Sequence, residues 1–204
     1  MRQVKKPEVR KAEIVETATG LFAEEGFERT TVGAIIGRMG VAKGCFYHHF
    51  ASKAEVFEAC VEALAERLLG EYVAILGDET RSPRRRLVDY VDHNYALAAR
   101  PSGAELAADL HSGGFADVHH RVTESVAARL LPVFAALIAQ GVEAGEFDVE
   151  DAEFTAAAML GALTGLHETY AARKDFELSR HREHLLAVLA RMLADPQIRE
   201  TEPR

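Results

Sequence analysis

The sequence predicts an all-α protein, and three observations support this prediction. Alanine, leucine, glutamate and arginine, which favour helices, dominate the 204-residue chain. Alternating runs of valine, isoleucine and threonine, which are typical of strands, are scarce, and the hairpin dipeptides Asn-Gly and Asp-Gly are absent. Apolar residues recur instead at helical spacing. With 48% hydrophobic and 27% charged residues, the composition is that of a folded protein with a sizeable core.

The first helix is expected over about residues 7–25. Its apolar residues follow the i, i+4, i+7, i+8 spacing of one helical face. They are Ile14, Ala18, Leu21 and Phe22. Gly26 ends this helix, and Phe27 can fold back on it as an anchor.

A second helix is expected after Thr30 or Thr31, either of which can cap its N-terminus. Its apolar stripe is Val32, Ile35, Ile36 and Met39. Gly40 ends it, because glycine tolerates the positive φ that a tight turn requires. A third, very short helix must fit between about residues 42 and 49.

A long fourth helix is expected from the capping box Ser-Lys-Ala-Glu at 52–55 to about residue 76. Ser82 is expected to cap the next helix, with Pro83 in its first position. Asp148 can cap a later helix, and Pro132 should kink or divide the one in which it lies. The later helices are expected over about 83–99, 102–112, 117–144, 149–173 and 179–194.

Charge is distributed unevenly along the chain. The net charge of −8 argues against indiscriminate binding to nucleic acid. Residues 1–53, however, hold nine Lys and Arg against six Asp and Glu, a net charge of +3, while the remaining residues hold 15 against 26, or −11. A basic N-terminal region followed by an acidic remainder indicates that only the N-terminal region binds a polyanion.

Two short helices joined by a glycine turn, with a supporting helix before them, form a helix-turn-helix arrangement. Val41, Phe46 and Phe50 are expected to complete its small core. The other side chains of the third helix then point elsewhere, and a helix enters the DNA major groove by its N-terminal end, where small residues allow close approach. Lys43 can donate to guanine or phosphate, Tyr47 and His48 to phosphates. The predicted DNA-binding residues are Thr31, Ala42, Lys43, Gly44, Cys45, Tyr47, His48 and Lys53.

The N-terminal arm carries further basic residues that can follow the DNA backbone or enter the minor groove. They are Arg2, Lys5, Lys6, Arg10 and Lys11. Thr31 and Lys53 stand at predicted helix N-termini, a position that suits a phosphate.

The segment TTVGAIIGRMGVAKGCFYHHFASKAEVF resembles the DNA-binding domain of TetR-type transcriptional regulators, and the resemblance covers about residues 8–60. It implies that Lys43, Gly44, Tyr47, His48 and Lys53 touch DNA, and that His49 and Phe50 are mainly structural. One position departs from the family pattern, since Cys45 stands where such proteins usually carry Ser, Thr or Asn. A thiol is a poor hydrogen-bond donor, so base reading at Cys45 is expected to be apolar, for example against a thymine methyl.

The expected organisation is an N-terminal three-helix DNA-binding domain (1–53), a connecting helix (54–76) and a helical ligand-sensing and dimerisation domain (77–204). The last of these is implied by a looser resemblance to the same family. Small residues in 154–170 let helices approach closely. A homodimer is therefore expected through the helices around 154–172 and 179–194, which pairs two operator half-sites about 34–36 Å apart.

An internal site for a small, largely apolar effector is expected among the helices of the body, where apolar and aromatic walls carry a few polar groups. Its candidate residues are Tyr90, His93, Asn94, Leu110, His111, Phe115, Phe134, Met159, Leu163 and His167. Each of these residues can equally serve as plain core.

The resulting hypothesis is a ligand-responsive transcriptional repressor, bound to double-stranded operator DNA as a homodimer and released by its effector. Residues 77–204 hold no catalytic motif, so neither an enzyme nor a cofactor is expected. Two cysteines without a disulfide framework indicate the cytoplasm, and no apolar run suggests a membrane span. Three alternatives remain: an activator, an architectural DNA binder without a ligand, and a helical enzyme with a metal held by Asp89, His93 and His111, although no metal is expected.

Overall fold

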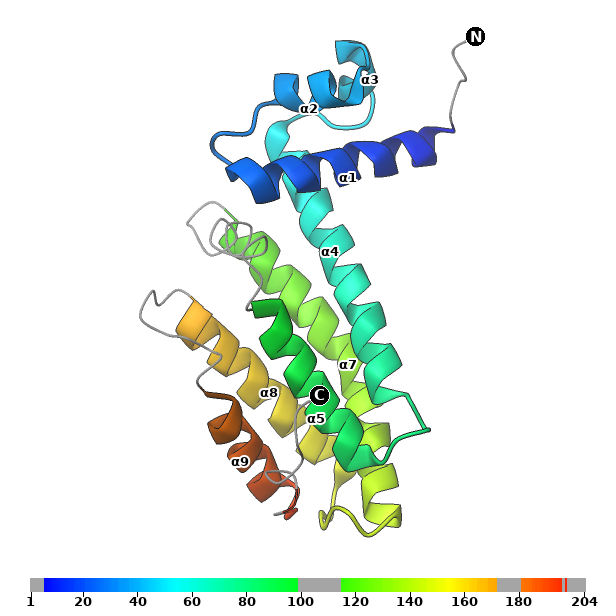
Figure 1. Cartoon of the computed structure of the whole chain (residues 1–204), viewed down its shortest axis with the longest axis vertical. Coiled ribbons are helices and arrows are strands. Elements are labelled where there is room, and N and C mark those ends of the chain that lie inside the picture. Colours follow the sequence, from blue (N-terminus) through cyan, green and yellow to red (C-terminus); the bar gives the residue numbers. More distant parts are fainter. Residues whose placement is uncertain (1–5, 99–114, 172–180, 196, 198–204) are drawn as a thin grey trace. The chain divides into compact units, whose positions relative to one another are not determined.

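The structure, a computed structural model, describes residues 6–98, 115–171, 181–195 and 197, with the side chains of residues 98, 167, 170 and 171 excepted. The described residues form helices and no strand, which confirms the predicted all-α class (Figure 1). The helices are α1 Pro7–Glu25, α2 Val32–Met39, α3 Lys43–Tyr47, α4 Lys53–Leu76, α5 Pro83–Ala98, α7 Ala116–Glu143, α8 Ala152–Ala171 and α9 Arg182–Met192.

The described residues fall into two compact units. The first unit takes its described residues from 6–66 and 115–122, and the second from 67–98 and 123–197. The division therefore falls within α4 and within α7. Each of these two helices contributes residues to both hydrophobic cores.

Helix boundaries in the first unit follow from the predicted capping residues. Gly26 has φ +78°, and its N–H donates to the carbonyl of Phe22, the last apolar residue of α1. The Thr31 hydroxyl accepts a hydrogen bond from the N–H of Ala34 at 3.1 Å, which makes Thr31 rather than Thr30 the N-cap of α2. Gly40 adopts the left-handed conformation, φ +63°, that ends α2.

The core of the first unit is built from the predicted stripes of α1 and α2, from Phe46 and Phe50, and from the start of α4. Thr30, which is fully buried, donates its hydroxyl proton within this core to backbone carbonyls at the end of α1. The buried apolar residues are Ile14, Ala18, Leu21, Phe22, Ile35, Phe46, Phe50, Val56, Phe57, Cys60, Val61 and Val118. Val41, predicted to join this core, is only half-buried.

The second unit packs α5, α7, α8 and α9 with the end of α4 around a larger core. Among its buried residues are Leu69, Leu76, Leu87, Tyr90, Phe134, Leu137, Ile138, Met159, Leu186 and Leu189. At one turn the chain approaches itself so closely that a Cβ on Gly141 would lie 2.0 Å from the ring of Phe147. Only glycine fits there.

One predicted helix feature of the second unit is wrong, and of the two effects predicted for Pro132, a kink or a division of its helix, the division is excluded. Asp151, not Asp148, caps α8, because its carboxylate accepts the N–H of Phe154 at 2.9 Å. Pro132 does not divide α7, which runs unbroken from Ala116 to Glu143. A proline leaves the carbonyl of Ala128 without its helical donor, but Ala128 is exposed, so water can take that place.

Among the described helices, α7 is long and apolar enough to cross a membrane by length and composition, with a mean hydropathy of 1.6. A core helix of a folded protein passes the same test. Four of the apolar side chains of α7 are buried in the second core, namely Leu130, Phe134, Leu137 and Ile138.

Candidate nucleic-acid interface

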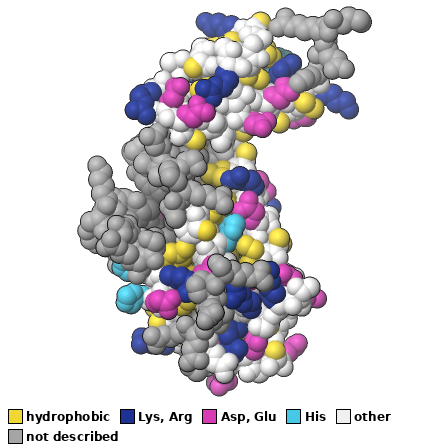
Figure 2. All heavy atoms as spheres, viewed as in Figure 1, with side chains coloured by type: hydrophobic (Ala, Val, Ile, Leu, Met, Phe, Trp, Pro, Cys, Tyr) yellow, Lys and Arg dark blue, Asp and Glu magenta, His cyan; other side chains and the backbone are white. Residues whose placement is uncertain are grey.

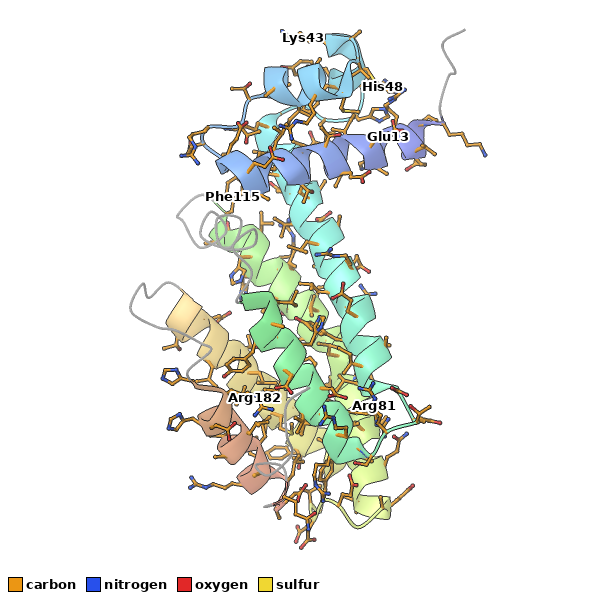
Figure 3. All side chains as sticks on the ribbon, viewed as in Figure 1. Glu13, Lys43, His48, Arg81, Phe115 and Arg182 are labelled. Atoms are coloured by element: carbon orange, nitrogen blue, oxygen red, sulfur yellow. The ribbon has the colours of Figure 1, made fainter. Side chains whose placement is uncertain are left out.

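The recognition helix predicted after the glycine turn is α3, a five-residue helix that Ala42 precedes as N-cap. One of its side chains, Phe46, is fully buried and anchors it to the core. Five residues in and beside this helix are exposed and form the α3 surface, which comprises Ala42, Lys43, Gly44, Tyr47 and His48. In Figure 3, Lys43 and His48 mark the two ends of this helix, and Figure 2 shows Lys and Arg side chains on the exposed face of the same unit.

Tyr47 is the most prominent apolar feature of the α3 surface, with 48% of the side chain exposed. Its ring lies edge-on to the buried ring of Phe46, with centroids 5.4 Å apart, and the ammonium of Lys43 lies 5.6 Å from its centroid. The tyrosine ring thus rests against the core on one side and is exposed on another. A phenol held this way is suited to donate to a phosphate.

Gly44 lies on the exposed side of α3, and among the described residues no atom outside the adjoining backbone lies within 4 Å of the place where a Cβ would stand. The fold therefore does not require glycine at this position. The missing side chain leaves the surface open to a partner that approaches the backbone closely.

Cys45 and the two histidines after Tyr47 differ in exposure. Cys45 is half-buried and carries no disulfide. His48 is exposed, while His49 is half-buried against it, with ring centroids 4.9 Å apart. Burial and the neighbouring His48 lower the pKa of His49, while Glu8 opposes that shift. A neutral His49 fits the structural role that the family pattern implies for it.

Thr31, the N-cap of α2, is exposed. Its hydroxyl oxygen accepts the N–H of Ala34, which leaves the hydroxyl proton free to be donated outward. In the arm, Lys6 and Lys11 are exposed, Arg10 is held by Glu13 at 2.8 Å, and Arg2 and Lys5 lie outside the described residues.

Lys53 has inward partners that the sequence pattern did not indicate. Its ammonium donates to the carbonyl of Phe27 at 2.7 Å and to that of Glu28 at 3.3 Å, and it lies 4.1 Å from the centroid of the Phe27 ring. In this structure the ammonium therefore ties the start of α4 to the α1–α2 turn.

The predicted effector residues are divided between the two units. Tyr90, Phe134 and Met159 are buried in the core of the second unit, and Leu163 packs against it. Phe115 is the exception, because it packs in the core of the first unit with Phe27 and Phe57. Leu110, His111 and the side chain of His167 lie outside the described residues.

The polar members of the predicted effector set are engaged in the second unit. The hydroxyl of Tyr72 donates to Asn94 Oδ1 at 2.8 Å, and the Asn94 amide donates to the carbonyl of Tyr90. His93 Nε2 lies 2.9 Å from a carboxylate oxygen of Glu71. Burial, and after it the charge of Glu71, raises the pKa of Tyr72 to about 12.

The metal-enzyme alternative needs Asp89 and His93 to converge with His111. Asp89 instead binds Arg81 and, at 2.8 Å, Arg85. Within the described ranges, no three His, Cys, Asp or Glu side chains are placed to hold a metal ion.

A short exposed helix after a glycine turn, held on a three-helix core, defines a helix-turn-helix DNA-binding protein. Residues 14–60 match the family model described as bacterial regulatory proteins, tetR family. This part of the chain is therefore a DNA-binding domain of the TetR type, the domain that marks a family of transcriptional regulators that are not enzymes.

Curated relatives match less than half of the chain. The transcriptional repressor KstR2 of Mycobacterium tuberculosis H37Rv is 34% identical over 94 residues, which cover 43% of this chain and 46% of the relative. The nucleoid occlusion factor SlmA of Haemophilus influenzae is 34% identical over 65 residues, 32% of this chain and 30% of that protein. The chain thus spans about half or less of the length of these relatives.

Solved structures match over nearly the whole chain. A TetR-family regulator from Pectobacterium atrosepticum has a TM-score of 0.77 at 20% identity, covering 96% of this chain and all of the other. FadR of Bacillus subtilis in complex with stearoyl-CoA has a TM-score of 0.61 at 16% identity, covering 87% of this chain and 96% of that one. These likenesses show the fold of the family.

Proposed function

We propose that this protein is a transcriptional repressor that binds a pseudo-palindromic operator as a homodimer in the cytoplasm and releases it when a small, largely apolar effector binds. The observation that carries the proposal is the α3 surface, where Lys43, Gly44, Tyr47 and His48 are exposed around a buried Phe46. Small residues at its N-terminal end permit close approach to base edges, and the polar side chains reach the phosphates on either side.

A homodimer is favoured by the exposed face of α8. Phe154, Ala158, Gly161 and Gly165 follow i, i+4, i+7, i+11 spacing, and all four are exposed. Phe154 is 72% exposed, and in the described part of the chain no atom outside the backbone of α8 lies within 4 Å of where a Cβ on either glycine would stand. An apolar stripe with two bare backbone positions suits close packing against the same stripe of a second copy.

The neighbouring helix extends this surface. α9 packs on α8, and its Val188 is 41% exposed. Two helices from each subunit then form a four-helix interface of the kind expected from the sequence around 154–172 and 179–194. The dimer matters for function, because one five-residue recognition helix makes few base contacts and a symmetric pair doubles them.

The effector is assigned to the second unit, where Tyr90, Phe134 and Met159 provide apolar and aromatic side chains and His93 and Asn94 provide polar groups nearby. Support for an apolar effector comes from the fold neighbour FadR, which was solved with stearoyl-CoA. Release requires the effector to bind one arrangement of the subunits more tightly than the DNA-bound arrangement. A coupling free energy of about 1–3 kcal/mol between effector binding and operator binding lowers operator affinity roughly 5–150-fold.

A second function, an architectural DNA binder without an effector, is favoured by one comparison. SlmA, which shares 34% identity over 65 residues, is a nucleoid occlusion factor rather than a repressor by name. The two functions differ in the number of genomic sites and in the response to ligands. Chromatin immunoprecipitation that finds one or a few promoters supports the repressor, whereas many sites spread over the chromosome support the architectural role.

DNA binding is tested by selection from a random duplex library, followed by anisotropy measurements on the enriched sequence. We expect an inverted repeat whose half-site centres lie about one helical turn apart. Lys43→Ala and Tyr47→Ala should each weaken binding at least tenfold. Tyr47→Phe, which keeps the ring and removes the hydroxyl, measures how much of the loss is due to the hydroxyl. Arg67→Ala, which removes an equally exposed charge from α4, is the matched control and should bind normally. An enriched pool no better than random DNA contradicts the proposal.

A further inference from the structure

Four phenylalanines meet in the first unit, and one of them comes from far along the chain. The ring centroids of Phe27 and Phe57 lie 5.0 Å apart, those of Phe22 and Phe57 5.2 Å, and the ring of Phe115 lies 4.7 Å from Phe27 and 4.3 Å from Phe57. Three of these residues belong to the segment 14–60 that defines the family. Phe115 lies outside it, directly before α7 (Figure 3).

The first two turns of α7 join the same unit. Val118 is 6% exposed and buried in its core, and Val122 packs against that core. Arg121 lies 3.4 Å from Glu58 of α4. The core beneath the helix-turn-helix is therefore completed by residues 115–122, not by residues 14–60 alone.

The side chain at the centre of this arrangement is Phe27, in the turn between α1 and α2. Phe115 covers its ring, and the Lys53 ammonium lies 4.1 Å from the ring centroid while donating to the Phe27 and Glu28 carbonyls. Phe27 stands four residues before Thr31, the N-cap of α2. Because this short turn leads directly into α2, which packs on α3, holding Phe27 also holds the helix-turn-helix.

We infer that Phe115 and Lys53 are positioning residues for DNA binding. Phe115, directly before α7, and Lys53, at the start of α4, both contact Phe27 and so hold the α1–α2 turn. Holding this turn fixes the placement of α2 and α3. This inference rests on the proposed function for its DNA-binding readout. It assigns the Lys53 ammonium to carbonyl partners within the protein rather than to a phosphate, and Phe115 to the DNA-binding unit rather than to the effector site.

Salt dependence separates a positioning lysine from one that binds phosphate. Each phosphate contact that is lost lowers the slope of log affinity against log salt concentration by about 0.9. Lys53→Met keeps the aliphatic stem and removes the charge, so we expect at least tenfold weaker operator binding with an unchanged slope. Lys43→Met, which removes an exposed ammonium of the α3 surface, serves as the comparison and should flatten the slope. A flattened slope for Lys53→Met would overturn the positioning role of Lys53.

Hydrogen exchange tests the turn without DNA. Phe115→Ala should speed amide exchange in residues 26–34 at least tenfold and weaken operator binding to a similar extent, whereas Phe115→Leu should retain most of both. Phe147→Ala, an equally drastic change in the second core, should leave exchange in 26–34 unaltered at a temperature where it is folded. Unchanged exchange in Phe115→Ala overturns the inference. If the wild-type protein binds no operator, the proposed function fails, but the exchange result still decides the role of Phe115.

Discussion

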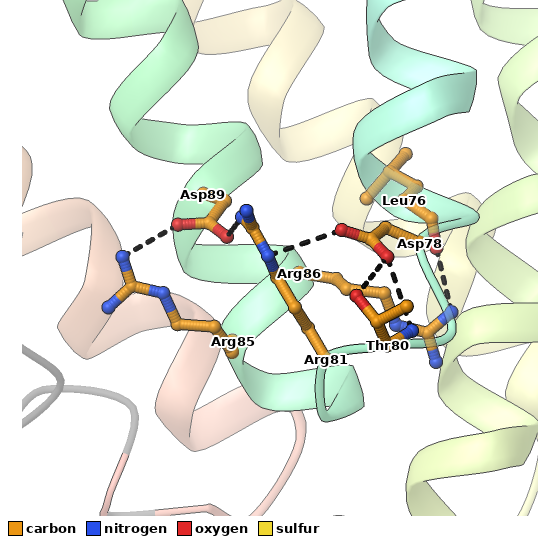
Figure 4. A network of polar contacts seen from close by, with 7 residues as sticks. All are labelled: Leu76, Asp78, Thr80, Arg81, Arg85, Arg86 and Asp89. Carbon is orange, nitrogen blue, oxygen red and sulfur yellow. Dashed lines mark hydrogen bonds and ion pairs between the residues drawn. The ribbon is translucent and has the colours of Figure 1, made fainter. Parts of the chain in front are cut away.

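The guanidinium of Arg86 donates to the carbonyl of Leu76, the last residue of α4, at 2.9 Å, although Arg86 is only 3% exposed. Its second nitrogen donates to the side chain of Gln140 on α7 at 2.5 Å. One buried cation thus joins the ends of α4, α5 and α7 by direct hydrogen bonds. Figure 4 shows the adjoining network, in which Arg81 and Arg85 bind Asp89 and Thr80 binds Asp78.

Removing this junction should destabilise the second unit. Arg86→Ala deletes a buried side chain and leaves the Leu76 carbonyl without its donor, so we expect the free energy of unfolding to fall by roughly 2–4 kcal/mol. Urea denaturation followed by circular dichroism measures the loss. Arg67→Ala, on the exposed side of α4, is the control and should change stability by less than about 0.5 kcal/mol. A loss below about 1 kcal/mol for Arg86→Ala would mean that water replaces the guanidinium at little cost.

Gly44 offers a test in which stability and DNA binding move in opposite directions. Because nothing in the protein lies near a Cβ at this position, Gly44→Ala should leave the fold intact and raise its stability by up to about 1 kcal/mol, as alanine favours helix over glycine. The added methyl projects from the α3 surface, so operator affinity should fall, and Gly44→Gln should lower it further. Gly70→Ala, at an exposed and equally open position of α4, should stabilise the protein with no effect on DNA binding.

One buried thiol and two buried tyrosine hydroxyls make the stability of the folded protein depend on pH in the alkaline range. Desolvation raises the pKa of Cys60 to about 11 and those of Tyr72 and Tyr95 to about 12. The folded state therefore keeps protons that the unfolded chain loses first, and this stability is complete below about pH 8.5, the ordinary pKa of a thiol. We expect the melting temperature to decline as pH rises from about 9 toward 12.

The share of Tyr72 in the alkaline decline can be measured separately. Phenolate absorbance near 295 nm should rise together with unfolding rather than before it. Tyr72→Phe removes one titrating hydroxyl, so its melting temperature should fall less steeply with pH, from a lower start because the bond to Asn94 is gone. Equal slopes for the variant and the wild type between pH 9 and 12 would contradict this assignment.

Most of the fold could be predicted from the sequence, because its helices end at residues with strong local preferences. Gly26, Gly40, Thr31 and the Ser52–Glu55 capping box each carry their own conformational signal, and the structure places the helix ends of the first unit at these residues. Asp151 was missed because Asp148 offers the same signal three residues earlier. The choice between them depends on where the chain has to turn, which no local pattern records.

The α3 surface was predictable for the same reason, since Phe46 and Phe50 belong inward and leave the neighbouring residues outside. The partners of Lys53 and Phe115 were not. Both make contacts to residues far away in sequence, Phe27 among them, and such contacts appear only once the helices are packed. A lysine at a helix N-terminus can face a phosphate or a protein carbonyl, and the spacing alone does not distinguish the two.

The dimer surface gives the last prediction. Phe154, at the start of the α8 stripe, is 72% exposed. In an isolated subunit, a charge in its place would leave the free energy of unfolding unchanged or raise it. In a symmetric dimer interface, the same change would bring two like charges together. We expect Phe154→Lys to dissociate the dimer, as measured by sedimentation velocity, and to weaken operator binding while circular dichroism stays unchanged. Val73→Lys, at a 42% exposed position on α4, should leave the protein dimeric. If Phe154→Lys sediments as the wild type does, the interface lies elsewhere, and the stripe formed by Phe154, Ala158, Gly161 and Gly165 needs another explanation.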